Sequence, residues 1–228
     1  MTKKESIKSR DRVVNHGEVF TSETEVRNML DMVKHETERV DSRFFEPACG
    51  TGNFLLEVLL RKFEVVSRNY SKSQIEYDKY MLLSVSSIYG VELLLDNTIE
   101  CQTRLYKLFK SNYTKVSKKE PSLQLKRSVK YILERNILNG DALTLLDALG
   151  EPILFSEWSL VLGRYIKRRD FKLSEMLSFP PIPTDDIRIN VMDDLLSEIS
   201  ESNLVVRVHK EYQPIEFERV YEQENSDK

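Results

Sequence analysis

One segment of the sequence carries the residue types of a ligand-binding turn. Residues 45–54 read Phe-Glu-Pro-Ala-Cys-Gly-Thr-Gly-Asn-Phe, with Gly50 and Gly52 separated by one residue. Glycine lets a ligand lie against the backbone where a Cβ would collide, and amides at the start of a following helix can meet a carboxylate or phosphate. The segment lacks the third glycine of a dinucleotide-binding turn and the Gly-Lys-Ser/Thr of a phosphate-binding loop, which makes NAD and ATP less suitable ligands.

Two acidic residues follow later apolar runs. Glu92 ends the run Ile88–Glu92, and Asp141 ends the turn Asn139-Gly140-Asp141. A carboxylate at the C-terminal end of a strand can accept hydrogen bonds from the hydroxyl groups of a ribose. A helix-capping role for Glu92 and ordinary turn chemistry for Asp141 remain open.

The elements that must position these residues alternate between strands and helices, which is typical of a parallel sheet covered on both faces. A capping box, Ser22 with Glu25, begins the first helix, whose buried face would hold Val26, Met29, Leu30 and Val33. Strands are expected at 43–46, 87–92, 136–138 and 152–155, and helices at 54–66, around 80–83, at 96–110 and at 125–133.

The last third of the chain departs from that alternation. Residues 160–167 are expected to form a hairpin that turns at Gly163-Arg164. The prolines at 180–183 break the chain, an amphipathic helix with Met192 and Ile199 follows, and 204–208 is expected to be a strand before a solvated acidic tail. The domains are therefore expected to be a polar arm at 1–20, a cofactor-binding domain at 21–178 and a C-terminal extension at 179–228.

Composition narrows the class of protein. The chain has 228 residues, of which 40% are hydrophobic and 31% charged, enough for one substantial core and too apolar for a disordered protein. No apolar run approaches the roughly 20 residues of a membrane span, and the charged start predicts no secretory signal. With two cysteines, three histidines and no Cys/His cluster, we expect no disulfide framework, no metal site and a cytoplasmic location.

The glycine segment resembles the S-adenosylmethionine motif of adenine-specific DNA methyltransferases, best the class found in type I and related restriction–modification systems. The resemblance implies an α/β fold of class I methyltransferase (Rossmann-like) type with a mostly parallel sheet, and a prokaryotic or phage-encoded protein. The segments at 15–22, 88–92 and 139–143 match further motifs of that family in order. The cofactor contacts that the resemblance implies are Phe20, Thr21, Glu46, Pro47, Ala48, Gly50, Gly52, Asn53, Phe54, Glu92, Asp141 and Ala142.

One family motif is missing. Adenine methylation in this family uses Asn-Pro-Pro-Tyr at the end of the fourth strand, and the chain contains neither this motif nor Asp-Pro-Pro-Tyr. The expected fourth strand ends instead at Ser156, Glu157 and Trp158. Trp158 is a candidate to stack on a flipped base, and Ser156 or Glu157 to accept from its amine. A core-packing role for Trp158 stays open, as does a capping or stapling role for Phe20 and Thr21.

The charges are unevenly distributed. Between Cys101 and Gly140 there are ten basic and two acidic residues, whereas Thr184–Lys228 holds twelve acidic and five basic residues. The basic segment is either a nucleic-acid contact or a solvated helix face. Lys167-Arg168-Arg169 is either a phosphate contact or an exposed hairpin end. Neither segment reads sequence by itself, so DNA specificity is expected to come from a specificity or restriction subunit.

Three functions follow from these observations. The first is a small S-adenosylmethionine-dependent DNA methyltransferase, with adenine N6 as target and a divergent base site. The second is a catalytically degenerate methyltransferase fold that serves as a binding subunit or regulator. The missing motif motivates this alternative, whereas the presence of all the cofactor motifs places the first function ahead of it. The third moves methyl transfer to RNA, protein or a small molecule, because no base-reading domain is evident.

Overall fold

The computed structural model describes Arg12, Val14 and residues 21–177 and 208–227. Its elements, in chain order, are α2 (Glu23–Met32), α3 (Lys34–Thr37), β1 (Phe44–Glu46), α4 (Asn53–Tyr70), α5 (Gln74–Ser86), β2 (Ile88–Glu92), α6 (Leu95–Ser117), α7 (Leu123–Asn136), β3 (Ile137–Asp141), β4 (Leu146–Asp147), β5 (Leu154–Leu160), β6 (Tyr165–Lys172), α8 (Leu173–Leu177), β7 (Lys210–Glu211), β8 (Ile215–Glu216) and the 3-10 helix η1 (Phe217–Asp227).

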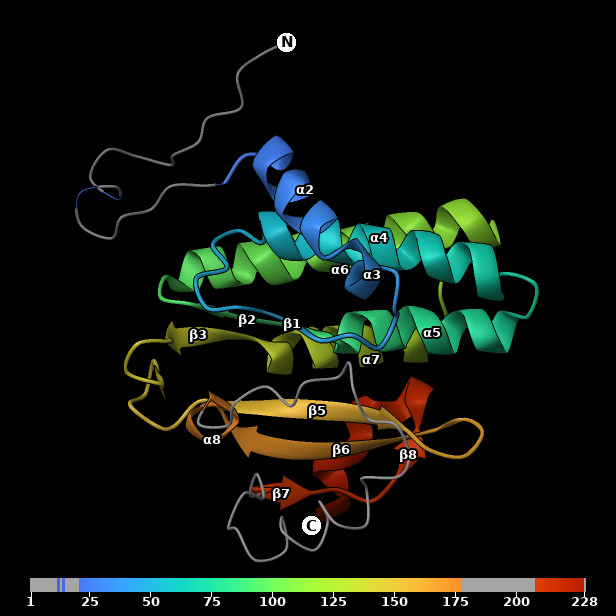
Figure 1. Cartoon of the computed structure of the whole chain (residues 1–228). Helices are drawn as coiled ribbons and strands as arrows, with labels where there is room; N and C mark the ends of the chain where they lie inside the picture. The colour runs from blue at the N-terminus through green and yellow to red at the C-terminus, as the bar shows by residue number, and fades with distance from the viewer. Residues whose placement is uncertain (1–11, 13, 15–20, 178–207, 228) are drawn as a thin grey trace, which may run out of the picture.

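The first sheet is mostly parallel. Strands β1, β2 and β3 are neighbours in that order, with Phe45 opposite Tyr89 and Gly90 opposite Ile137, and β4 adds an antiparallel edge. Each parallel connection contains two helices. Helices α4 and α6 lie on one side of the sheet, and α5 and α7 lie on the other (Figure 1). The expected α/β architecture with a mostly parallel sheet is confirmed at this level.

Most of the expected elements up to Asp141 are present. The capping box is confirmed, because Ser22 and Glu25 exchange both of its hydrogen bonds. Of the four residues expected on the buried face of α2, however, only Val26 and Leu30 are buried, while Met29 is 46% exposed and Val33, at the C-cap, is 37% exposed. The expected four-residue buried face is therefore wrong by half, because α2 packs on α4 along a narrow stripe.

The expected fourth parallel strand is wrong. Residues 154–160 form β5, which does not end at Trp158 and pairs antiparallel with β6 in a second sheet that also contains β7 and β8. The hairpin expected at 160–167 is confirmed, and Gly163 adopts a φ of 64° in its turn. Figure 1 shows this sheet as a separate layer beside α7 and the first sheet. The crossover helix that a fourth parallel strand requires is absent between β3 and β5 in the described chain.

A buried ion pair holds the second sheet in place. The guanidinium of Arg168 donates to both carboxylate oxygens of Asp170 at 2.8 and 2.7 Å, and the two residues are 3% and 5% exposed. Tyr131 of α7 accepts a further hydrogen bond from Arg168 at 2.7 Å, and the Tyr212 hydroxyl donates to Asp170 at 3.1 Å. Each charge is thus paired and hydrogen-bonded, as burial requires.

The acidic C-terminal segment is not a solvated tail. Phe217 and Val220 of η1 are buried in the main core, and η1 packs along α7. The expectation of a solvated tail is wrong because burial of these two apolar side chains stabilises the packed segment, while the acidic side chains around them can stay in contact with water. The proline break at 180–183, the expected helix around Met192–Ile199 and most of the expected strand at 204–208 lie outside the described residues, as does most of the 1–20 arm.

Lys62 is a buried cation in the apolar stripe of α4. Its side chain is 0% exposed, and the ammonium donates to the carbonyl oxygens of Val40 and Ser42 and to Oγ of Ser87, at 2.5 Å in the last case. It thereby ties the segment before β1 to the residue before β2. Burial lowers the pKa of Lys62 from its ordinary value near 10.5 to about 7.

Lys62 should make stability depend on pH. A folded-state pKa below the unfolded one means that the unfolded chain binds more protons between about pH 7 and pH 10. The free energy of unfolding should therefore rise with pH across this window, by about 1 to 3 kcal/mol from pH 7 to pH 9.5. Urea unfolding of the unaltered chain and of Lys62→Met at both pH values measures this, and the variant should lose the rise. Lys34→Met, at an exposed position, is the control, and an equal rise in all three proteins would contradict the role of Lys62.

Candidate functional site

The glycine loop joins β1 to α4 at the carboxyl edge of the first sheet. Gly50 and Gly52 adopt φ values of 53° and 89°, in the left-handed region that favours glycine. The loop is tied to the next strand, because the Cys49 amide donates to the carbonyl of Val91 at 3.0 Å. Gly52 is the N-cap of α4, and no side chain caps this helix start. Its first-turn amides are therefore not used by a capping side chain.

Two glycines are also required by close internal packing. A Cβ on Gly52 would lie 2.6 Å from Sγ of Cys101 in α6, and a Cβ on Gly90 in β2 would lie 2.9 Å from Sγ of Cys49. The two cysteines are buried and free, and the hydrogen bond to Cys101, together with burial, raises the pKa of the Cys49 thiol. Gly52 therefore serves the contact between the loop and α6, which the sequence interpretation did not foresee.

Glu92 braces the glycine loop. The carboxylate is 7% exposed and accepts from the amide of Gly50 at 2.8 Å and from the amide of Leu94 at 3.0 Å. The side-chain amide of Asn97 donates to the same carboxylate at 3.3 Å. Glu92 thus lies beside the loop, at the end of the strand where it was expected, and both of its oxygens are engaged within the protein.

Arg104 is a loop-positioning residue that sequence reasoning assigned only to the basic segment. Its guanidinium donates to the carbonyl oxygen of Thr51 at 2.6 Å, to Oγ1 of Thr51 at 2.7 Å and to Oδ1 of Asn53 at 3.0 Å. The side-chain amide of Asn53 in turn donates to the carbonyl of Thr21 at 3.1 Å. This chain of contacts fixes the start of α2 against the glycine loop. The sequence did contain a signal for this role, because Arg104 is a cation at the edge of the apolar stripe that begins at Cys101.

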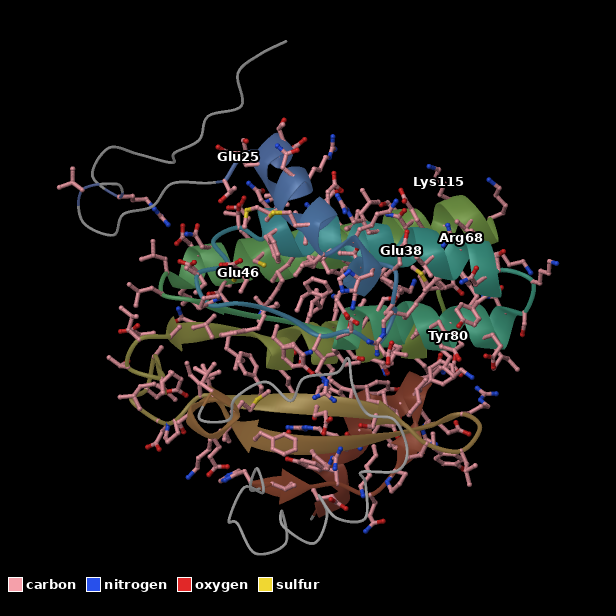
Figure 2. All side chains as sticks on the ribbon, in the orientation of Figure 1. Glu25, Glu38, Glu46, Arg68, Tyr80 and Lys115 are labelled. Atoms are coloured by element: carbon pink, nitrogen blue, oxygen red, sulfur yellow. The ribbon has the colours of Figure 1, made fainter. Side chains whose placement is uncertain are left out.

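A cavity of about 170 Å³ lies at this loop. Six of the expected cofactor contacts line it, together with Met29, Cys49 and Thr51; the six are Thr21, Glu46, Ala48, Gly50, Asn53 and Phe54. Glu46 is half-buried, and no cation pairs with its carboxylate among the described residues. Burial raises the pKa of Glu46, and the amide of Ala48 opposes this by donating to it. Figure 2 shows Glu46 at this edge of the molecule.

The remaining expected contacts lie around that cavity or beyond it. Pro47 is exposed in the loop, and Gly52 is buried at the N-cap of α4. Asp141 and Ala142 are half-exposed at the carboxyl end of β3, on the same edge of the sheet as Glu46 and Glu92. Oδ1 of Asp141 accepts from the amide of Leu143 at 2.8 Å, which is the turn chemistry left open above. Phe20 lies outside the described residues.

The three expected base-site residues are not at this edge. Ser156 and Trp158 are 2% and 5% exposed on the inner face of β5. The Ser156 hydroxyl donates to Asp170 at 2.7 Å, and the Trp158 indole donates to Oδ1 of Asn136 at 3.1 Å. Glu157 points to the opposite face of β5, where it pairs with Arg169 at 2.6 Å and with Arg43. Because strand residues alternate between faces, these three side chains do not converge.

A second cavity, of about 600 Å³, opens at the amino ends of β1 and β2. Its lining includes Arg43, Ser87, Tyr80 and Trp158, together with residues of α4. In Figure 2 the labels of Glu46 and Tyr80 mark the two opposite edges. The larger cavity is therefore separated by the length of the sheet from the glycine loop, and its mixture of acidic, basic and aromatic residues favours no one ligand.

The part of the chain that the structure describes contains neither a metal-binding cluster nor a helix suited to span a membrane. Among the described residues, no group of three or more His, Cys, Asp and Glu side chains could hold a metal ion. Over the same part of the chain, no helix is both long enough and apolar enough to cross a membrane. Comparison with protein-family models, with curated proteins and with solved structures finds no match to this chain.

Removing the Arg104 guanidinium should loosen the glycine loop. Arg104→Gln leaves the acceptors on Thr51 and Asn53 without their donor, which should cost about 1 to 3 kcal/mol of unfolding free energy. Amide hydrogen exchange in peptides that cover residues 47–56 should become faster. Lys107→Gln, one turn along α6 and exposed, is the control and should leave exchange unchanged. Unchanged exchange in Arg104→Gln would show that the loop does not depend on this residue.

Proposed function

We propose that this chain binds S-adenosylmethionine at the carboxyl edge of its first sheet and serves methyl transfer to DNA, with adenine N6 as the target, in a restriction–modification system. The fold that this function requires is the class I methyltransferase type. Support comes from the order β1, glycine loop, α4, followed by acidic residues at the ends of β2 and β3.

The observation that carries the proposal is the half-buried carboxylate of Glu46 beside an uncapped helix start. Glu46 lines the cavity and has no cationic partner among the described residues, while α4 begins at the same cavity without a side-chain cap. A zwitterionic, positively charged ligand suits this pair, because its cationic groups are attracted by the carboxylate and its own carboxylate by the helix amides. S-adenosylmethionine has both kinds of charge.

The residues at this edge fit the parts of that cofactor in different ways. The cavity of about 170 Å³ is smaller than the roughly 300 to 1,000 Å³ of typical small-molecule sites, so it suits the amino-acid end of the molecule. Asp141, half-exposed on the same edge, is the acceptor proposed for the adenine amine. When bound, S-adenosylmethionine supplies an activated methyl group on its sulfonium. Thr21 and the first-turn amides of α4 would hold the ligand, and Asn53, Glu92 and Arg104 would keep the loop in shape.

Burial of two of the expected base-site residues favours a version of this function in which the chain binds the cofactor but does not methylate DNA alone. Ser156 and Trp158 are buried and hydrogen-bonded to Asp170 and Asn136. Neither side chain is free to accept from an amine or to stack on a flipped base. These contacts favour a binding subunit of a methylation system, whose target-base groups come from a partner, over a chain that methylates alone.

Cofactor binding is tested by calorimetric titration with S-adenosylmethionine. The unaltered chain should bind, and Glu46→Gln should raise Kd by about tenfold or more, because a charge-assisted contact is worth about 1.5 to 3 kcal/mol. Glu64→Gln, an exposed position on α4, is the matched control and should bind like the unaltered chain. Absence of binding by the unaltered chain would reject the proposal, and equal binding by both variants would remove Glu46 from the site.

The choice between enzyme and binding subunit is tested by label transfer. Purified chain, tritiated S-adenosylmethionine and duplex DNA should give no labelled DNA above the level of the Glu46→Gln variant, because Ser156 and Trp158 are held in the core. Labelled DNA would reject the binding-subunit version. In that case a Glu157→Gln variant, which alters the least buried of the three residues, would show by loss of transfer whether β5 takes part.

A further inference from the structure

The stretch of this acidic chain that spans α6, α7 and the loop between them is rich in basic residues. The whole sequence has 34 Lys and Arg against 37 Asp and Glu. Residues 106–134 alone contain eight basic residues against Glu120 and Glu134. We call the eight the basic helix face: Lys107, Lys110, Lys115, Lys118, Lys119, Lys126, Arg127 and Lys130. Seven of them are exposed, and Lys126 is half-exposed.

Burial of one stripe of α6 directs its lysines to solvent. Cys101, Leu105, Phe109 and Tyr113 recur every four residues and are buried in the core. The opposite stripe of α6 therefore carries its lysines. No large apolar side chain is exposed between residues 107 and 118. Figure 2 shows Lys115 extending away from the helix.

Contacts between α6, α7 and the loop that joins them bring Lys110, Lys126 and Lys130 together on one surface. Glu120, in the loop between them, lies 3.2 Å from the ammonium of Lys110 and 3.8 Å from that of Lys126. Further along, the ammonium of Lys130 lies 5.0 Å from the ring centre of Tyr106. A groove of about 260 Å³ runs between the two helices at this point, with Tyr106 and Lys130 in its lining.

Among the residues that the structure describes, several of these cations have no carboxylate partner. Lys107, Lys115 and Lys119 pair with no carboxylate among the described residues, and the Lys118 ammonium donates only to the carbonyl of Lys115. A cluster of like charges without counter-charges repels itself and is stabilised by a polyanion. The face is therefore complementary to a row of phosphates.

We propose that the basic helix face binds the phosphate backbone of duplex DNA, independently of base sequence. From Lys107 to Lys118 the axis of α6 rises about 17 Å, and a duplex carries one charge per about 1.7 Å, so the face meets several phosphates at once. Lysine contacts to phosphate position a protein without reading bases. A membrane surface suits the face less, because interfacial helices expose an apolar stripe and that of α6 is buried. The choice of DNA rests on the proposed function.

The test compares two triple variants that remove the same charge. Lys107→Gln/Lys115→Gln/Lys119→Gln alters the face, and Lys34→Gln/Lys172→Gln/Lys210→Gln alters α3, β6 and β7 instead. Fluorescence anisotropy with a labelled 30-base-pair duplex measures Kd over a series of salt concentrations. The face variant should bind about tenfold or more weakly at low salt, with a slope of log K against log salt reduced by about 2 to 3. The control should stay within about twofold of the unaltered chain.

Two outcomes overturn the proposal. One is equal weakening in both triple variants, and the other is no duplex binding by the unaltered chain, in which case tight binding to phosphatidylserine vesicles would identify a membrane surface as the partner instead. Titration with S-adenosylmethionine separates this proposal from the proposed function. The face variant should bind the cofactor like the unaltered chain. If the unaltered chain binds duplex DNA but does not bind S-adenosylmethionine, the proposed function is rejected, whereas the proposal that the basic helix face binds DNA is retained.

Discussion

The glycine loop packs directly against α6 and β2, and the rest of the candidate site depends on this packing. Cys101 leaves no room for a side chain on Gly52, and Cys49 leaves none on Gly90. Only because both positions lack a Cβ can α4 begin over the end of β2. That placement brings the amide of Gly50 to Glu92 at 2.8 Å and puts the uncapped start of α4 beside Glu46. Gly52 and Gly90 are thus required for packing, and the ligand cavity is a consequence of that packing.

Local patterns predicted the half of the fold that local interactions determine. The capping box of α2, the run from β1 through the glycine loop into α4, and the acidic ends of β2 and β3 all depend on neighbours within a few residues. The same patterns could not show that Glu92 faces Gly50 rather than solvent. That contact joins residues 42 positions apart, and only the parallel pairing of β1 with β2 creates it.

The hairpin turn of the second sheet could be predicted, but the antiparallel pairing of residues 154–160 could not, because side chains distant in the sequence determine it. A short apolar run at 152–155 suits a parallel strand as well as an antiparallel one. The antiparallel pairing depends on Arg168 and Asp170, which the sequence predicts at an exposed hairpin end. In the structure both are buried, and Arg168 donates to Ser156 and to Tyr131. The reading of Lys167-Arg168-Arg169 as a phosphate contact fails for Arg168 for the same reason. A charged pair inside a hairpin is a structural anchor when a tyrosine from α7 completes its hydrogen bonds.

Helix α6 contributes to both proposed sites, because its buried stripe and its exposed stripe make different contacts. Its buried stripe carries Cys101, and at the border of that stripe Arg104 holds Thr51 and Asn53 of the glycine loop. Its solvent stripe carries the lysines of the basic helix face. Since a helix is stiff over this length, a polyanion held on the outer stripe and a ligand held at the loop would contact the same rigid element. The distance along α6 from Arg104 to Lys107 is one turn, so the cation that shapes the cofactor loop and the first cation of the proposed DNA face are neighbours on one helix. The physical difference between them is burial: Arg104 has its acceptors within the protein, and Lys107 has none among the described residues.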